Sequence, residues 1–290
     1  MEALLQTLAN GMIIGGTYAL MAVGLTMIFG FMDLVNFAHG ELYMLGAYFA
    51  FTFIVLFGLP VWAGLALAVL TVMLLGYLLD RVLFRPLRGQ DILVRMLTTV
   101  GLMIIFPNVA ILVWNPVPKR VPMPLEAQPL IVGPIRLAPV HLMVVLVAVG
   151  VIVGFHLFMQ HTKTGTAMRA TFQDREVAAA MGVDVEGIYG YTFAIGAGMA
   201  AAGGALLSMV YIIMPTMGAM ATTKAFAVVI LGGLGNFMGA ILGALIIGVS
   251  ETFAATYAIT GYKDAVAFIL LVLILLLKPS GILGKARSVE

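Results

Sequence analysis

The long stretches without a charged side chain restrict what this chain can fold into more than any other feature. A helix needs about 20 apolar residues to cross the hydrocarbon of a bilayer. A soluble helix of that length would keep one polar face, and these stretches have none. They lie between Glu2 and Asp33, Glu41 and Asp80, Arg95 and Lys119, Arg136 and Lys163, Glu186 and Lys224, Lys224 and Glu251, and Asp264 and Lys278. The sequence therefore predicts an all-α polytopic membrane protein.

The composition supports this prediction and excludes other classes of protein. Of the 290 residues, 62% are hydrophobic and only 10% are charged, whereas a soluble domain carries about a quarter charged residues. Apolar runs of this length exclude a β-barrel, whose strands would alternate in polarity over about ten residues. The chain has no cysteine and a net charge of +2, which excludes disulfides and thiolate metal sites and gives nucleic-acid binding no support.

The positions of the apolar runs predict about eight transmembrane helices in a single transmembrane domain, residues 1–290. Gly58-Leu59-Pro60 divides the longest run into two spans joined by a tight turn. A broken or re-entrant pair is expected near the C-terminus, followed by one last helix. We expect helices over about 4–30, 38–57, 61–80, 96–114, 140–160 and 188–212, then the pair at 224–233 and 236–256, and finally 264–278.

The distribution of lysine and arginine predicts the orientation of the chain. Basic residues gather in cytoplasmic loops, and ten of the 15 fall in three segments, namely 81–95, 163–175 and 278–287. Placing these segments inside puts the N-terminus in the periplasm and the C-terminus in the cytoplasm. The periplasmic loop at about 115–139 contains seven prolines, which favour extended chain over helix. We expect an ordered cap with a short hairpin there, either as a docking surface for an external partner or as a stiff connector.

Two glycine-rich segments interrupt the apolar runs, one in each half of the chain. The first is Gly30–Glu41 and the second is Gly232–Gly239, and both contain Asn-Phe followed by small residues and a helix. Paired interruptions of this kind indicate a pseudo-repeat of two halves with a central site. Glu251 lies deep in an apolar run, where a charge must face the protein interior or an aqueous cavity. The candidate substrate pathway is therefore Asn36, Phe37, His39, Glu41, Gly235, Asn236, Phe237 and Glu251. The alternative is that the glycines only permit close helix packing.

The longest cytoplasmic loop, about 161–187, contains a short helix that suits docking onto a soluble partner. The expected helix runs from Phe172 to Met181, with Thr171 as its N-cap and Gly182 closing its end. Such a helix can insert into a groove of another protein, although a solvated surface helix is the alternative.

Several motifs together resemble the branched-chain amino acid ABC permease family. Residues 176–182, Glu-Val-Ala-Ala-Ala-Met-Gly, are similar to the Glu-Ala-Ala-x-x-x-Gly element of ABC importer permeases. Val177 replaces an alanine of that element, and the Ile-x-Leu-Pro that often follows it is missing. The segments 36–41, 164–170 and 232–236 resemble this branch in particular, and the resemblance covers nearly the whole chain.

The resemblance implies a permease subunit of a bacterial inner-membrane importer that works by alternating access. Its partners would be a second related permease chain, identical or paralogous, two cytoplasmic ATPase subunits and a periplasmic binding protein. Substrates would be branched-chain or other hydrophobic amino acids, or alternatively urea and short amides. ATPase coupling would fall to Arg169, Asp174, Arg175, Glu176, Ala178, Met181 and Gly182.

The chain's own motifs agree that any ATP-driven engine is a separate protein. It has no Gly-x-x-x-x-Gly-Lys-[Ser/Thr] loop, and it has neither Gly-x-Ser-x-Gly nor His-Glu-x-x-His, so we expect no catalytic residue, metal site or cofactor. An ion-coupled secondary transporter stays open as an alternative, with Glu251 as its candidate carboxylate.

Overall fold

The apolar runs form helices, as expected. The structure is a computed structural model, and it describes residues 2–122, 130–132, 135–257 and 263–284. Its elements are α1 (Glu2–Met32), α2 (His39–Phe51), α3 (Val61–Leu79), α4 (Ile92–Trp114), β1 (Leu130–Val132), β2 (Ile135–Leu137), α5 (Pro139–His161), α6 (Lys163–Gln173), α7 (Arg175–Ala180), α8 (Val185–Leu207), α9 (Met217–Gly232), α10 (Phe237–Tyr257) and α11 (Lys263–Leu277). Within these ranges, seven helices are long and apolar enough to cross a membrane, while α9 and α11 are shorter.

Two of the spans are completed by a short π-helical segment. Thr52–Leu56 extends α2 and Asp80–Phe84 extends α3, so the spans run from His39 to Leu56 and from Val61 to Phe84. The tight turn between them falls at Gly58, whose φ of +69° is the left-handed conformation that glycine adopts at no steric cost.

Three helices form the centre of the bundle and three others form much of its outside. In the apolar windows of α1, α2 and α8, 72%, 61% and 83% of the residues are buried, against 22–28% for α3, α4 and α5. Small residues let the central helices approach closely, which matters because lipid supplies no hydrophobic force between helices. A Cβ at Gly204 of α8 would collide with the carbonyl oxygen of Tyr43 on α2, and one at Gly46 of α2 would collide with Ala201 on α8.

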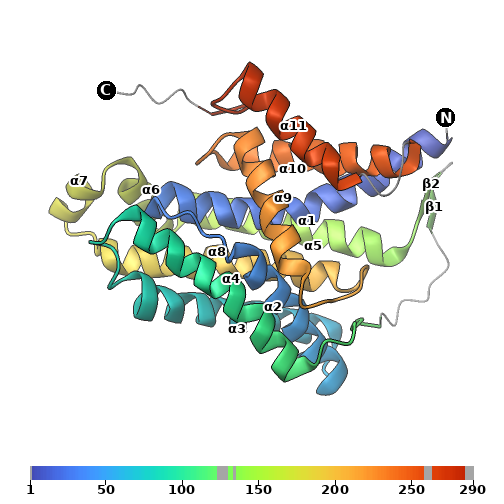
Figure 1. The fold of residues 1–290 in the computed structure, drawn as a ribbon, viewed down its shortest axis with the longest axis horizontal. Helices are drawn as coiled ribbons and strands as arrows, with labels where there is room; N and C mark the ends of the chain where they lie inside the picture. The colour runs from blue at the N-terminus through green and yellow to red at the C-terminus, as the bar shows by residue number, and fades with distance from the viewer. Residues whose placement is uncertain (1, 123–129, 133–134, 258–262, 285–290) are drawn as a thin grey trace.

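The two ends of the bundle are distinct (Figure 1). The N-terminus and the β1–β2 hairpin lie at one end, here called the N-terminal end, while α6 and α7 lie at the opposite end. Lys119, in the proline-rich loop, pairs with Ile213, in the α8–α9 connection, through two backbone hydrogen bonds of 3.0 and 2.9 Å. The two connections therefore share the N-terminal end, which agrees with the predicted number of crossings between them.

The proline-rich loop contains the expected hairpin. β1 and β2 pair antiparallel, with Ile131 opposite Arg136. The remaining part of this predicted cap, residues 123–129 and 133–134, lies outside the described residues.

Three expected boundaries are wrong. The span predicted to end at residue 212 ends at Leu207, and the next helix begins at Met217 instead of 224. Lys224 marked a boundary in the sequence because a charge usually lies outside the hydrocarbon, yet its ammonium is paired inside the protein. The expected helix from Phe172 to Met181 is also divided, because α6 ends at Gln173 and Asp174 caps α7.

Candidate functional site

The α1–α2 connection, residues 33–38, is an irregular segment that is largely buried between helices from Leu34 onward, and threonines from two helices bind its backbone. On α4, the Thr99 hydroxyl accepts from the Phe37 N–H at 3.2 Å. On α9, the Thr222 hydroxyl donates to the Phe37 carbonyl at 3.1 Å and accepts from the Gly40 N–H at 2.9 Å. Irregular backbone at membrane depth needs such partners. The segment is therefore tied to α9, a link that spacing in the sequence could not reveal.

Asn36, His39 and Glu41 of this break are buried, and they make different contacts. Asn36 accepts from the Ala38 N–H at 3.1 Å, and His39 Nε2 lies 3.0 Å from the Met21 carbonyl oxygen. Glu41 is fully buried, and neither of its carboxylate oxygens has a hydrogen-bond partner among the described residues. The carboxyl group packs against Gly218 in the first turn of α9, and a helix N-terminus favours a negative charge.

The second break, between α9 and α10, lies beside the end of α1 and is held by the C-terminal segment. Gly233 and Gly235 take φ values of +108° and +79°, which an L side chain rarely adopts. Asn236 accepts from the Gly239 N–H at 2.9 Å and donates to the Leu283 carbonyl at 2.8 Å. Phe237 begins α10. Asn236 thus caps a helix, and its predicted role in a pathway stays a prediction.

The predicted pathway residues do not meet at one point. Asn36, Phe37, His39 and Glu41 share the α1–α2 break, Gly235, Asn236 and Phe237 share the α9–α10 break, and Glu251 lies apart from both on α10. Glu251 alone among them lines the larger cavity described next.

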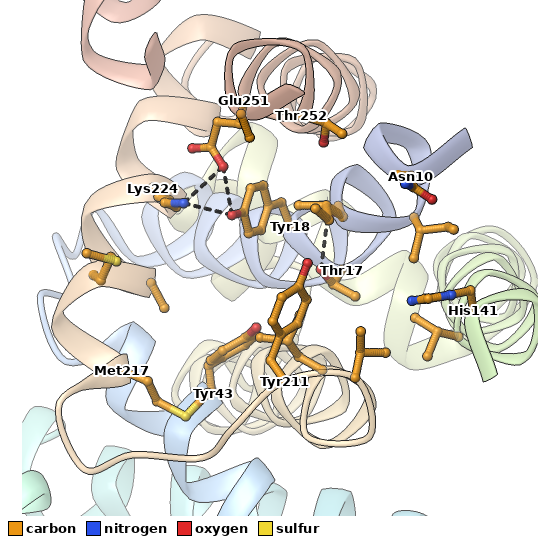
Figure 2. Close-up of a pocket in the computed structure, with 18 of the residues that line it drawn as sticks. Asn10, Thr17, Tyr18, Tyr43, His141, Tyr211, Met217, Lys224, Glu251 and Thr252 are labelled. Atoms are coloured by element: carbon orange, nitrogen blue, oxygen red, sulfur yellow. Dashed lines mark hydrogen bonds and ion pairs between the residues drawn. The ribbon is translucent and has the colours of Figure 1, made fainter. Parts of the chain in front are cut away.

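A cavity of about 460 Å³ opens between α1, α2, α5, α8, α9 and α10 in the half of the bundle near the N-terminal end (Figure 2). Its volume falls within the range of about 300–1,000 Å³ typical of small-molecule sites. Most of the wall is apolar, and a few polar side chains point inward. Its lining includes Asn10, Ile13, Ile14, Thr17, Tyr18, Tyr43, His141, Val144, Leu207, Val210, Tyr211, Ile212, Met217, Met220, Ala221, Lys224, Glu251, Thr252 and Ala255.

An ion pair with a tyrosine forms the charged part of this cavity (Figure 2). Lys224 Nζ lies 2.9 Å from Glu251 Oε2 and 2.9 Å from the Tyr18 hydroxyl oxygen, and the Tyr18 hydroxyl donates to the same carboxylate oxygen at 2.9 Å. The side chains of Lys224 and Glu251 are 11% and 5% exposed. Glu251 Oε1 is buried and has no hydrogen-bond partner among the described residues. We call these three residues the charged triad.

Sequence reasoning found one member of the triad and missed two. The sequence predicts that Glu251 faces the protein interior or an aqueous cavity, whereas Lys224 falls at the predicted start of a helix and Tyr18 inside an apolar span. The available sequence signal of an interior charge was Lys224 itself, because it lies two residues after Thr222 inside a stretch of small residues. The partner of such a charge comes from another helix, so only the fold identifies it.

At the opposite end, α6 and α7 present the residues predicted for ATPase coupling. Asp174 accepts from the N–H groups of Glu176 and Val177 and so caps α7, which takes over the role predicted for Thr171. Met181 is 81% exposed, whereas Ala178 is buried. Gly182, with φ +85°, ends the helix as expected. Arg169 binds the Gln160 side-chain oxygen at 2.9 Å.

A second cavity, of about 280 Å³, lies beside α7 and contains Arg175 and Glu176 in its wall together with Arg88 and Arg95. Arg88 binds both carboxylate oxygens of Asp80, at 2.6 and 2.7 Å, and also Glu186. This network joins the end of α3 to the start of α8 next to α7.

Aromatic rings connect α6 with the two breaks. The Phe172 ring lies 5.1 Å from that of Phe31, at the end of α1, and Phe31 lies 6.1 Å from Phe237, at the start of α10. Phe155 of α5 lies 5.8 Å from Phe237. We call these four rings the aromatic cluster. No group of three or more His, Cys, Asp or Glu side chains suited to a metal ion occurs in the part of the chain that the structure describes.

Comparison with known proteins gives matches along nearly the whole chain. A family model described as "Branched-chain amino acid transport system / permease component" matches residues 7–275. The high-affinity branched-chain amino acid transport system permease protein BraD of Pseudomonas aeruginosa is 37% identical, covering 97% of this chain and 96% of its own length. The permease protein LivH of Escherichia coli K12 is 35% identical with the same coverage. A probable LivH of Methanocaldococcus jannaschii is 26% identical, over 98% of this chain and 95% of its own length.

Proposed function

This chain belongs to the branched-chain amino acid transport permease family, and from that membership we propose that it is the membrane-spanning permease subunit of an importer for branched-chain or other hydrophobic amino acids. The observation that carries the proposal is the family match over residues 7–275, together with 37% identity to BraD over 97% of the chain. The bundle of seven long apolar helices suits a protein that resides in the membrane.

The proposed partners are a second related permease chain, two cytoplasmic ATPase subunits and a periplasmic binding protein. Since the sequence has no phosphate-binding loop of the Gly-x-x-x-x-Gly-Lys-[Ser/Thr] type, the proposal assigns ATP hydrolysis to separate ATPase subunits and transport alone to this chain. The exposed side chains of Val177 and Met181, 58% and 81% accessible on and just after α7, suit docking into a groove of that ATPase. Arg169, Asp174, Arg175, Glu176, Ala178 and Gly182 would shape this docking element.

The proposed orientation places the N-terminal end in the periplasm and α6–α7 in the cytoplasm of a bacterial inner membrane. The excess of lysine and arginine in the segments near α6–α7 supports it. The large cavity then lies on the periplasmic side, where a binding protein would deliver substrate.

The proposed mechanism is alternating access. Residues 36–41 lie deeper in the bundle than the cavity, because α2 starts at His39 and runs outward past Tyr43, which lines the cavity. Asn36, Phe37, His39 and Glu41 would line the deeper part of the path. Closure of the ATPase would act on α6 and α7, and the aromatic cluster would carry that movement to the two breaks, including Gly235, Asn236 and Phe237.

The cavity favours amino acids over urea and short amides as substrates, and it also argues against an ion-coupled transporter. Its apolar wall suits a hydrophobic side chain, whereas urea and short amides carry no charge for the triad to bind. An ion-coupled transporter would use Glu251 for its ion, but Lys224 already neutralises that carboxylate.

Reconstitution tests the proposal. The chain is assembled in liposomes with its partner permease, ATPase subunits and binding protein, and uptake of labelled leucine, isoleucine, valine and urea is measured. We expect ATP-dependent uptake of the three amino acids and none of urea. Uptake of urea alone, or uptake driven by a sodium or proton gradient without ATPase subunits, would contradict the assignment.

A further inference from the structure

Stability alone does not account for the charged triad in this bundle. A buried ion pair is a weak source of stability, because removing two charges from water costs about as much as their attraction returns. Ionisable groups at membrane depth usually belong to a site that binds or transfers something. Lys224 and Glu251 come from different helices, α9 and α10, and both face the 460 Å³ cavity.

We propose that Lys224 and Glu251 form the recognition site for the α-carboxylate and α-ammonium groups of a zwitterionic amino acid, with Tyr18 positioning both side chains. The inference rests on the proposed function and names the subsite within it. The substrate's carboxylate binds the Lys224 ammonium, and its ammonium binds the Glu251 carboxylate. Glu251 Oε1 is buried and has no hydrogen-bond partner among the described residues, so the carboxylate keeps one acceptor that its contacts with Lys224 and Tyr18 do not use.

Charge balance makes the site selective. When a zwitterion inserts between Lys224 and Glu251, each charge exchanges one opposite partner for another, and the buried site stays neutral throughout. An amine without a carboxylate leaves Lys224 unsatisfied, and a keto acid without an amino group leaves Glu251 unsatisfied. Leaving one charge of a buried pair without its partner is strongly unfavourable.

The remainder of the cavity fits the rest of the substrate. The aliphatic side chains in the cavity wall can surround a branched hydrocarbon, and they include Ile13, Ile14, Val144, Leu207 and Val210. Tyr18 donates to Glu251 and accepts from Lys224, so it fixes the two charged groups in one place without binding the substrate itself.

A thiol-protection experiment tests the site without the binding protein, whose own selectivity would hide that of the permease. Because the chain contains no cysteine, Thr252→Cys places a single thiol of this chain in the cavity wall. The assembled complex of permease and ATPase subunits is treated with a maleimide in the presence of L-leucine, 3-methylbutylamine or 4-methyl-2-oxopentanoate. Modification of this chain is followed by its mass.

We expect L-leucine to slow modification and the two singly charged analogues to have no effect. In a Lys224→Met/Glu251→Gln background, the leucine concentration for half-protection should rise roughly tenfold or more, since charge-assisted hydrogen bonds are lost. Thr223→Val, one residue away on the exposed side of α9, is the matched control and should leave protection unchanged. Co-purification with the ATPase subunits verifies that each variant assembles.

The inference is overturned if leucine gives no protection, if all three compounds protect equally, or if the doubly neutral variant is protected as well as its parent. The comparison of the three compounds uses only the Thr252→Cys chain, so it decides the question even if the double variant does not assemble. ATP-driven leucine uptake by the wild-type complex is measured separately. A complex that takes up leucine but shows no protection contradicts this inference and leaves the proposed function intact.

Discussion

The Thr222 hydroxyl makes two hydrogen bonds to backbone groups at the α1–α2 break. It accepts from the Gly40 N–H and donates to the Phe37 carbonyl, and it is 3% exposed. Thr222→Val keeps the shape but leaves both backbone groups without this partner, at a cost of about 1–3 kcal/mol for an unsatisfied buried group. We expect a lower thermal unfolding temperature of the complex in detergent and reduced leucine uptake.

The control for this residue lies beside it. Thr223→Val removes a hydroxyl that bonds only within its own helix, to the Ala219 carbonyl at 2.9 Å, and should change neither quantity. Equal unfolding temperatures for the two variants would show that the break does not depend on the hydroxyl of Thr222.

At the residue scale, the sequence placed Glu251 inside the protein but identified neither its partner nor the other buried charge, Lys224. Asn36, His39 and Glu41 are buried, which their place in a glycine-rich break did not by itself indicate. Lys224 was misassigned because a single charge in a run has two possible explanations, a loop or an internal partner. Glu251 lies 27 positions away on another helix, and no local pattern connects the two.

Among the helices, α7 gives the clearest prediction about assembly with the ATPase. Met181→Glu puts a charge on a side chain that is 81% exposed and touches little of its own chain, so folding should be unaffected. If this residue fits an apolar groove of the ATPase, burying the new carboxylate there is costly, and co-purification of the ATPase should fall at least about tenfold.

Glu176→Arg tests the same surface by reversing a charge. Lys163→Gln, on the exposed side of α6, is the control that should keep full co-purification. Wild-type amounts of ATPase with both Met181→Glu and Glu176→Arg would remove α7 from the docking surface.

The aromatic cluster gives a second expectation for this end of the molecule. Phe172→Ala removes the ring that contacts Phe31, 5.1 Å away, while the capping of α7 by Asp174 remains. We expect the ATPase to bind as before but the amount of leucine moved per ATP hydrolysed to fall severalfold, since α6 loses its contact with the breaks. An unchanged ratio of transport to hydrolysis would show that movement passes elsewhere.

Element boundaries show where sequence reasoning works and where it fails. Long apolar runs give the spans to within a few residues, because lipid imposes their length. The α6–α7 region was harder, since Thr171 and Asp174 are both suitable caps. Asp174 prevails because the chain turns there, and Thr171 bonds back to the Ala167 carbonyl inside α6.

At the scale of the whole molecule, the proposed orientation of the chain in the membrane can be tested. Val117 and Met181 are 60% and 81% exposed at opposite ends of the bundle, in a chain without native cysteine. We expect an impermeant maleimide to modify Val117→Cys in spheroplasts, and to modify Met181→Cys only after the membrane is opened. The reverse pattern would place α6 and α7 outside the cell and remove the basis for ATPase docking.

At this scale, the sequence predicted an all-α membrane bundle and the order of its helices, because composition and charge-free length alone require them. It could not predict which helices become central. The burial of α1, α2 and α8 depends on close approaches such as Gly204 to Tyr43, which only the assembled bundle contains. The pseudo-repeat of two halves stays a prediction.

The backbone pairing of Lys119 with Ile213 also couples the movement of two loops, the proline-rich loop and the α8–α9 connection. Neither segment can shift without the other unless two hydrogen bonds break, and only three residues separate Ile213 from the first turn of α9. A displacement of the proline-rich loop is therefore transmitted through a short stretch of main chain to α9, the helix that carries Lys224.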